Sequence, residues 1–147
     1  MRFPLASPVL DAASRLLAPV VLLFAVYVVA HGHDSPGGGF QGGVLFAAGM
    51  ILVKLTRGGL GGWEIGPAAA LSLACTGVAI FAGIGFAAVA YGGNYLDYAV
   101  PPLLRDPVTE RVVGTLGIEI GVALTVTGVI LLVFDALVGW DDREEPS

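Results

Sequence analysis

The sequence predicts an all-α integral membrane protein with four transmembrane helices and both termini in the cytoplasm. Hydrophobic residues make up 56% of the 147 positions and charged residues only 13%, about half the charged share of an ordinary soluble domain. The mean hydropathy is +0.85, and four long apolar stretches fill most of the chain. Lipid is therefore the expected solvent for most of this protein.

We expect one membrane domain over residues 12–138, with spans at about residues 12–30, 39–55, 65–91 and 112–138. The first and third spans are long enough to cross about 30 Å of hydrocarbon. We expect the first span to be retained and not removed as a signal peptide, because Asp11 interrupts the basic region before it. The fourth span is also long enough, but it carries Glu119 and Asp135, which lipid disfavours.

The second span is the weakest of the four, because its uninterrupted apolar part, residues 42–53, is short enough for a re-entrant segment. With four spans, five basic residues share one side of the membrane, namely Arg2, Arg15, Lys54, Arg57 and Arg143. Only Arg105 and Arg111 then lie on the other side, whereas a re-entrant segment would divide the seven four against three. The positive-inside rule favours four spans, with residues 1–11 and the acidic tail, residues 139–147, in the cytoplasm.

A glycine-rich segment, residues 32–43 with the sequence GHDSPGGGFQGG, joins the first two spans. Its glycines satisfy the pattern of a dinucleotide-binding loop, but that loop must follow a strand of a parallel sheet, and this one follows a membrane helix. We therefore expect the glycines to let a tight turn pack against a neighbouring backbone. Pro36 would pre-set the chain for helix entry, and Phe40 would insert into a partner surface.

The histidines of this region, His31 and His33, are followed by Asp34. They could bind a metal or titrate near neutral pH. Since only three ligands are at hand, we expect a polar cluster at a helix end, with no metal and no other cofactor, and keep His33 as a candidate for proton handling. Cys75 is the only cysteine, which excludes an intrachain disulfide and a Cys-based metal site. No basic cluster offers a footprint for nucleic acid.

The fourth span contains the most informative pattern of the spans. At 100° per residue, Gly117 and Gly121 share one stripe suited to close helix contact, while Glu119 points to the opposite side. Asp135 returns to the glycine stripe, so we expect the two carboxylates not to line one common path. Both faces must be covered by protein or water, which four short spans can hardly supply, and this implies partner subunits.

Two interpretations of Glu119 stay open at this point. It either ties helices together as a hydrogen-bonded carboxyl or lines a route for cations or protons. Asp135 lies near the cytoplasmic end of its span, where headgroups can solvate it. In the third span, Ala79, Gly83 and Ala87 form another stripe of small residues that we expect to serve helix packing.

Two of these segments together resemble a known family. The first is the loop pattern Gly-His-x-x-Pro-Gly-Gly-Gly-Phe-x-Gly-Gly, and the second is Glu-Ile-Gly-Val-x-Leu-Thr-Val in a last helix that ends Phe134-Asp135. They resemble the MnhB or MrpB family, the B-type members of the Mrp-type multisubunit sodium/proton antiporters. The resemblance covers about residues 15–137. A related domain in membrane-bound hydrogenases and in fused antiporter A subunits is similar too.

The resemblance implies a small four-helix accessory subunit with no catalytic centre of its own, in a large complex of the prokaryotic plasma membrane. Such complexes exchange cytoplasmic sodium for external protons and contain further subunits of the A, C, D, E, F and G types. The alternative is a membrane coupling subunit of a hydrogenase-like or complex I-like oxidoreductase, which the proteins encoded next door would distinguish.

The family's motif residues carry over to Gly32, His33, Pro36, Gly37, Gly38, Gly39 and Phe40 in the loop and to Glu119 and Gly121 in the last helix. Together with the charge pattern, this makes Glu119, His33 and Asp135 the candidates for an ion path.

Overall fold

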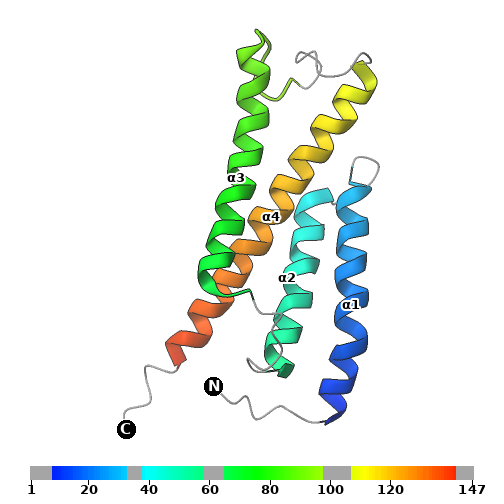
Figure 1. The fold of residues 1–147 in the computed structure, drawn as a ribbon, viewed down its shortest axis with the longest axis vertical. Helices are drawn as coiled ribbons and strands as arrows, with labels where there is room; N and C mark the ends of the chain where they lie inside the picture. The colour runs from blue at the N-terminus through cyan, green and yellow to red at the C-terminus, as the bar shows by residue number, and fades with distance from the viewer. Residues whose placement is uncertain (1–7, 33–37, 58–64, 98–106, 142–147) are drawn as a thin grey trace.

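The computed structural model describes residues 8–32, 38–57, 65–97 and 107–141. Within them lie four helices, α1 Pro8–Ala30, α2 Gly38–Arg57, α3 Pro67–Ala90 and α4 Pro107–Asp141 (Figure 1). Each is long and apolar enough to cross a membrane, and the described residues contain no strand. The predicted fold class is therefore confirmed. The second segment, for which a re-entrant structure was the alternative, forms a helix of 20 residues.

The helices lie side by side in the order α3, α4, α2, α1 (Figure 1). α4 packs between α3 and α2, and α1 packs on α2. α2 and α4 run in the same direction, and the start of α1 lies at the same end of the molecule as the end of α4 (Figure 1). This arrangement brings the two ends of the helical domain to one side of the membrane. That this side is the cytoplasm stays a prediction.

Proline and glycine define the bounds of α3 and the start of α4. Pro67 occupies the first turn of α3, where a missing backbone N–H costs nothing. At the other end Gly92 adopts the left-handed conformation, with φ of +88°, and the Gly93 N–H donates to the Ala88 carbonyl at 3.0 Å. This is the usual way for a helix to satisfy its last carbonyls. α4 begins at Pro107, while Asp106, the predicted N-cap, lies outside the described residues.

Small residues bring α3 and α4 into close contact. The buried positions of α3 are Ala70, Ala74, Gly77, Gly85 and Ala88. From α4, Gly117 lies against Ile84, Gly121 against Gly77, and Gly128 against Ala70 and Ala74. A Cβ atom on Gly128 would lie 2.6 Å from the Ala74 nitrogen, so only glycine permits this approach of the two backbones.

The other small-residue stripe of α3 does not pack against a helix of this chain. Ala79 and Gly83 are exposed and Ala87 is half-buried. A Cβ atom on Gly83 would meet no atom within 4 Å. The physical reason is that Ala79 follows Gly77 by two residues, or about 200° around the helix, and therefore faces away from α4. A packing role for Ala79, Gly83 and Ala87 against a partner subunit stays a proposal.

Most of the surface of this layer is left to lipid or to other proteins. Only 17% of the α1 span and 22% of the α3 and α4 spans are buried within the chain. The α2 span reaches 39% because it lies between α1 and α4. The protein therefore has no enclosed bundle core, and what holds it together is the contact between neighbouring helices.

We expect Gly77→Ala to destabilise the subunit, because the new Cβ atom would lie 2.6 Å from the Thr125 nitrogen. Overpacking of this kind costs about 1 to 3 kcal/mol. The matched control is Gly83→Ala, where the site is open and the higher helix propensity of alanine gains up to about 1 kcal/mol. Thermal unfolding of the purified subunit in detergent measures both, and equal midpoint shifts would contradict this description of the interface.

Candidate functional site

Glu119 joins the middle of α4 to the start of α2. Its Oε2 atom accepts a hydrogen bond from the backbone N–H of Gly39. α2 begins at Gly38, so this N–H belongs to the first turn, whose donors have no acceptor within the helix. Helix N-termini attract carboxylates because the peptide dipoles point their positive ends there. The Glu119 side chain is thus half-buried and fixed by a group that lipid could not satisfy.

The glycines of the loop motif make room for this contact. Gly38 has a φ of +39°, which favours glycine, and a Cβ atom there would collide with the Glu119 carboxyl group. A Cβ atom on Gly39 would lie 2.9 Å from the Glu119 Cα atom, and one on Gly32 would lie 3.1 Å from its Cδ atom. The loop motif and Glu119, 80 residues apart in the sequence, therefore form one site.

The remaining loop residues have different positions. The Phe40 side chain is 64% exposed, so it does not insert into its own chain. His31 is exposed at the end of α1, and its ring stacks on Tyr27 with 4.2 Å between the ring centroids. His33, Pro36 and Gly37 lie outside the described residues. Within the described residues, no group of three or more His, Cys, Asp or Glu side chains could hold a metal ion.

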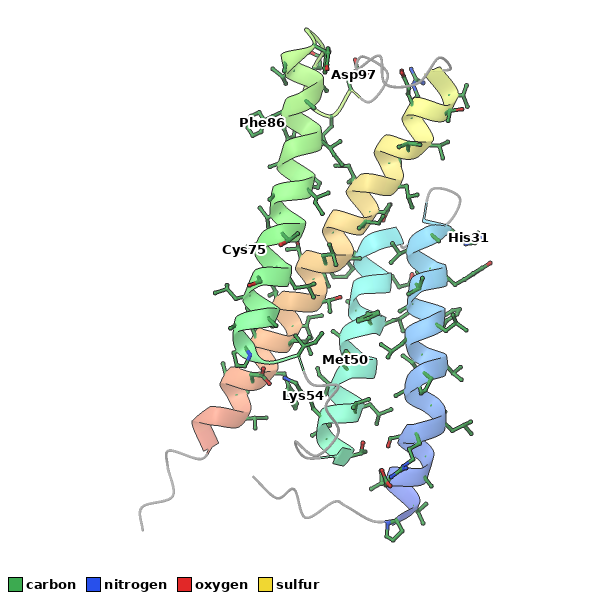
Figure 2. The ribbon with its side chains drawn as sticks, viewed as in Figure 1. His31, Met50, Lys54, Cys75, Phe86 and Asp97 are labelled. Carbon is green, nitrogen blue, oxygen red and sulfur yellow. The ribbon has the colours of Figure 1, made fainter. Side chains whose placement is uncertain are left out.

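Asp135 forms an ion pair with Lys54 of α2. The Lys54 Nζ atom lies 2.7 Å from one carboxylate oxygen and 2.8 Å from the other. The two side chains are only 12% and 19% exposed, and Figure 2 shows Lys54 directed from α2 toward α4. Because removal of one partner leaves the other charge uncompensated, breaking a buried pair costs about 3 to 5 kcal/mol. The expectation that headgroups solvate Asp135 is therefore wrong, and sequence reasoning missed the role of Lys54.

Both carboxylates face α2, contrary to the expectation that they point to opposite sides of α4. The α4 residues along this contact recur every fourth position, namely Glu119, Ala123, Thr127, Leu131 and Asp135. Such a row is inclined to the helix axis and winds slowly around it. α4 crosses α2 diagonally (Figure 1), so the contact follows the inclined row. We call this contact the α2–α4 seam.

The middle of the α2–α4 seam is narrow and bonded. A Cβ atom on Gly43 would lie 2.8 Å from the Ala123 carbonyl oxygen. The buried hydroxyl of Thr127 donates to the Gly43 carbonyl at 3.1 Å. Toward the end of the seam, Leu131 packs with Met50. Both acidic residues of the seam thus find partners inside the chain, so covering these two carboxylates does not by itself require other subunits, contrary to expectation.

One oxygen of Glu119 keeps its capacity to accept. Among the described residues, the Gly39 N–H is the one hydrogen-bond donor to this carboxyl group, and it binds Oε2. Oε1 is therefore available to a cation, to water or to a group from another subunit.

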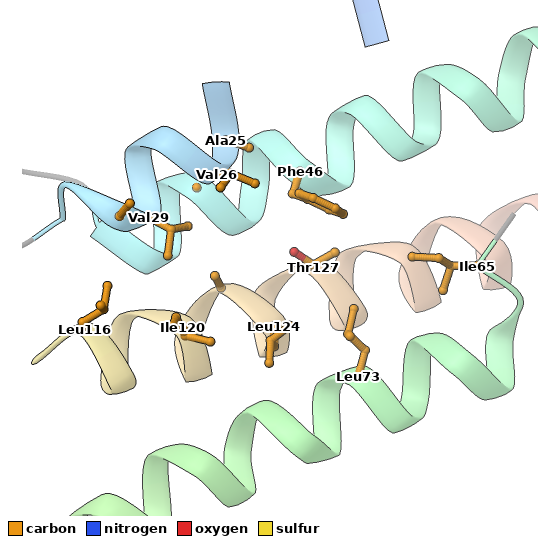
Figure 3. Close-up of a pocket in the computed structure, with 13 residues that line it drawn as sticks. Ala25, Val26, Val29, Phe46, Ile65, Leu73, Leu116, Ile120, Leu124 and Thr127 are labelled. Carbon is orange, nitrogen blue, oxygen red and sulfur yellow. The ribbon is translucent and has the colours of Figure 1, made fainter. Parts of the chain in front are cut away.

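An apolar groove of about 520 Å³ lies beside the seam. Figure 3 shows residues of α1, α2 and α4 around it, together with Ile65 and Leu73. The polar side chain among those that line it is Thr127, whose hydroxyl already donates to Gly43. An unpaired ion would incur a large desolvation cost in such surroundings. The groove suits an apolar side chain or an acyl chain, and it is not an ion path.

A layer of four membrane-length helices, with a carboxylate and an ion pair between the second and fourth, defines a small multi-pass membrane subunit. Comparison with known proteins gives its family. The family described as "Domain related to MnhB subunit of Na+/H+ antiporter" matches residues 9–132. The chain therefore belongs to the MnhB family of Na+/H+ antiporter subunits, as its loop and last helix predicted, and it is a multi-pass protein of a prokaryotic membrane.

Individual relatives agree with this assignment over most of their length. The "Putative antiporter subunit mnhB2" of Staphylococcus haemolyticus is 33% identical over 133 residues, which cover 89% of this chain and 94% of that protein. The B-type Na(+)/H(+) antiporter protein of Bacillus subtilis is 26% identical over 88% of this chain and 91% of its own length. Its counterpart of the same name from Alkalihalophilus pseudofirmus is 30% identical over 80% of this chain and 87% of its own.

We expect Gly39→Ala to separate the start of α2 from α4, because its Cβ atom would meet the Glu119 backbone. The destabilisation should be about 1 to 3 kcal/mol. Gly66→Ala is the matched control, since a Cβ atom there meets nothing within 4 Å. Chemical denaturation of the purified subunit compares the two variants. A Gly39→Ala variant as stable as the Gly66→Ala variant would show that the close approach is not required.

Proposed function

We propose that this chain is an accessory membrane subunit of a multisubunit sodium/proton antiporter, which supports assembly of the complex and lines a cation path with Glu119. The observation that carries this proposal is the position of the Glu119 carboxyl group, at the junction of the loop motif and α4, with Oε1 still able to accept. The names of the relatives support an antiporter over a redox-coupled complex.

A carboxylate within a membrane span is costly unless a partner or a function retains it. Tying α2 to α4 requires one acceptor atom, which Oε2 provides, whereas binding a cation such as Na⁺ requires further oxygen ligands. Oε1 is the atom of this site that can supply one. Because the groove beside it is apolar, the rest of the path is supplied by other subunits, of the A, C, D, E, F and G types.

The exposed surface of the layer supports the assembly role. Phe40 directly follows the two buried glycines of the site, yet its ring is 64% exposed. A large aromatic side chain at the edge of a fixed site is a typical anchor for a partner protein. The loop motif thus serves two contacts, with its glycines toward Glu119 and its phenylalanine toward another subunit.

We expect Glu119→Gln to assemble normally but to lose sodium-dependent proton movement. The amide oxygen can still accept from the Gly39 N–H, so the helix contact is kept, but a neutral amide can neither titrate nor pair with a cation. Glu119→Ala removes the acceptor as well and should also reduce assembly. Subunit co-purification measures assembly, and sodium-driven pH changes in everted vesicles measure transport.

The matched control is Asp11→Asn, which replaces a carboxylate by an amide at the other end of the helical layer. Asp11 pairs with Arg15 within α1, and the pair is exposed, so its loss should leave both measurements unchanged. Normal exchange in Glu119→Gln with poor assembly in Glu119→Ala would remove the ion-path role and leave Glu119 as a structural tie between helices.

We expect Phe40→Ala to leave the stability of the isolated subunit unchanged but to weaken its binding to partners. Burial of a whole phenylalanine ring in a partner would make the loss about 3 to 5 kcal/mol. Phe24→Ala is the control, because this ring is also exposed, at 53%, but lies on α1 away from the loop motif. Quantitative pull-down of the other subunits tests this, and equal recovery with both variants would contradict an anchor role.

A further inference from the structure

We propose that Lys54 and Asp135 act as a positioning clamp, which sets the register of α2 on α4 and thereby holds the first turn of α2 against Glu119. The clamp is the ion pair itself, with Lys54 Nζ at 2.7 and 2.8 Å from the Asp135 carboxylate oxygens. Its part in transport rests on the proposed function of Glu119, whereas its part in register does not.

The α2–α4 seam is tied at both ends by polar contacts of matched spacing. Gly39 and Lys54 are fifteen residues apart on α2, and Glu119 and Asp135 are sixteen residues apart on α4. At 1.5 Å per residue these lengths are about 22 and 24 Å. Because the two helices run in parallel, one register satisfies both ties. A slip by one helical turn, about 5.4 Å, would break them together.

The apolar part of the seam cannot set this register alone. Gly43 and Ala123 meet without large side chains that interlock, and lipid gives apolar helices no hydrophobic reason to prefer one alignment. The Thr127 hydroxyl bond to Gly43 contributes one neutral contact, worth about 0.5 to 1.5 kcal/mol. A charged pair is directional and costly to break in these surroundings, and the best-attested use of buried polar pairs is to specify register.

The pair also differs from the other ion pair of the described residues. That pair, Asp11 with Arg15, joins two residues of one helix, and its side chains are 35% and 67% exposed. Lys54 and Asp135 join two different helices and are largely shielded. Only the second pair can transmit the position of one helix to another.

The test uses the whole antiporter complex and compares four forms of this subunit with the wild type. They are Lys54→Gln, Asp135→Asn, the charge exchange Lys54→Asp with Asp135→Lys, and the control Asp11→Asn with Arg15→Gln. Amide hydrogen exchange over residues 38–43 reports whether the first turn of α2 stays bound to Glu119. Sodium-driven proton movement in everted vesicles is measured on the same preparations.

We expect each single variant to raise amide exchange over residues 38–43 by at least about tenfold, because one unpaired charge weakens the seam. The charge exchange should return it close to the wild-type rate, and the control pair should not change it. Unchanged amide exchange in both single variants would overturn the clamp. So would a charge-exchanged form that fails to assemble or stays as unprotected as the single variants, because pairing would then not be what matters.

The two readouts separate this inference from the proposed function. Faster amide exchange with normal transport would support the clamp and overturn the role of Glu119 in transport. Faster amide exchange with lost transport, both reversed by charge exchange, would support the two proposals together. Lost transport in the single variants with normal amide protection would overturn the clamp while leaving the Glu119 experiment to stand on its own result.

Discussion

Polar groups that enter lipid must be bonded within protein, and the α2–α4 seam is where this chain meets that requirement. The contact between Glu119 and the Gly39 N–H satisfies an acid of one helix with an unpaired donor of another. The Lys54–Asp135 pair neutralises two charges at the other end. α1 packs on α2 and α3 packs on α4, so the seam is what connects the two helical hairpins into one layer.

The membrane fold could be predicted from the sequence because long apolar stretches are a strong signal, and the charge distribution then selected four spans. The neighbours of Glu119 and Asp135 could not be predicted in the same way. A projection at 100° per residue treats each contact as a straight stripe along the helix. α4 instead meets α2 along a row of every fourth residue, which drifts by about 160° between Glu119 and Asp135. A Lys54 counted only as a cytoplasmic charge was therefore not recognised as a partner.

Small residues caused the other error. α3 carries alanine and glycine on every face, so a stripe of them cannot tell which face meets α4. In the loop motif, by contrast, the sequence predicted a close backbone contact correctly in kind but did not identify what was approached. The answer depended on Glu119, 80 residues away from Gly39, and a single sequence has no local pattern that joins the two.

The unequal lengths of the helices have a consequence for the bilayer itself. α4 begins at Pro107 and reaches Glu119 only after about 18 Å of helix, and Figure 1 shows α3 and α4 continuing past the ends of α1 and α2. The layer therefore has a step, with the Glu119 site on its lower level. Lipid that follows both hairpins must thin toward α1 and α2. Thinning draws the aqueous boundary of that leaflet down toward the carboxylate and shortens the distance that an ion must travel to reach it.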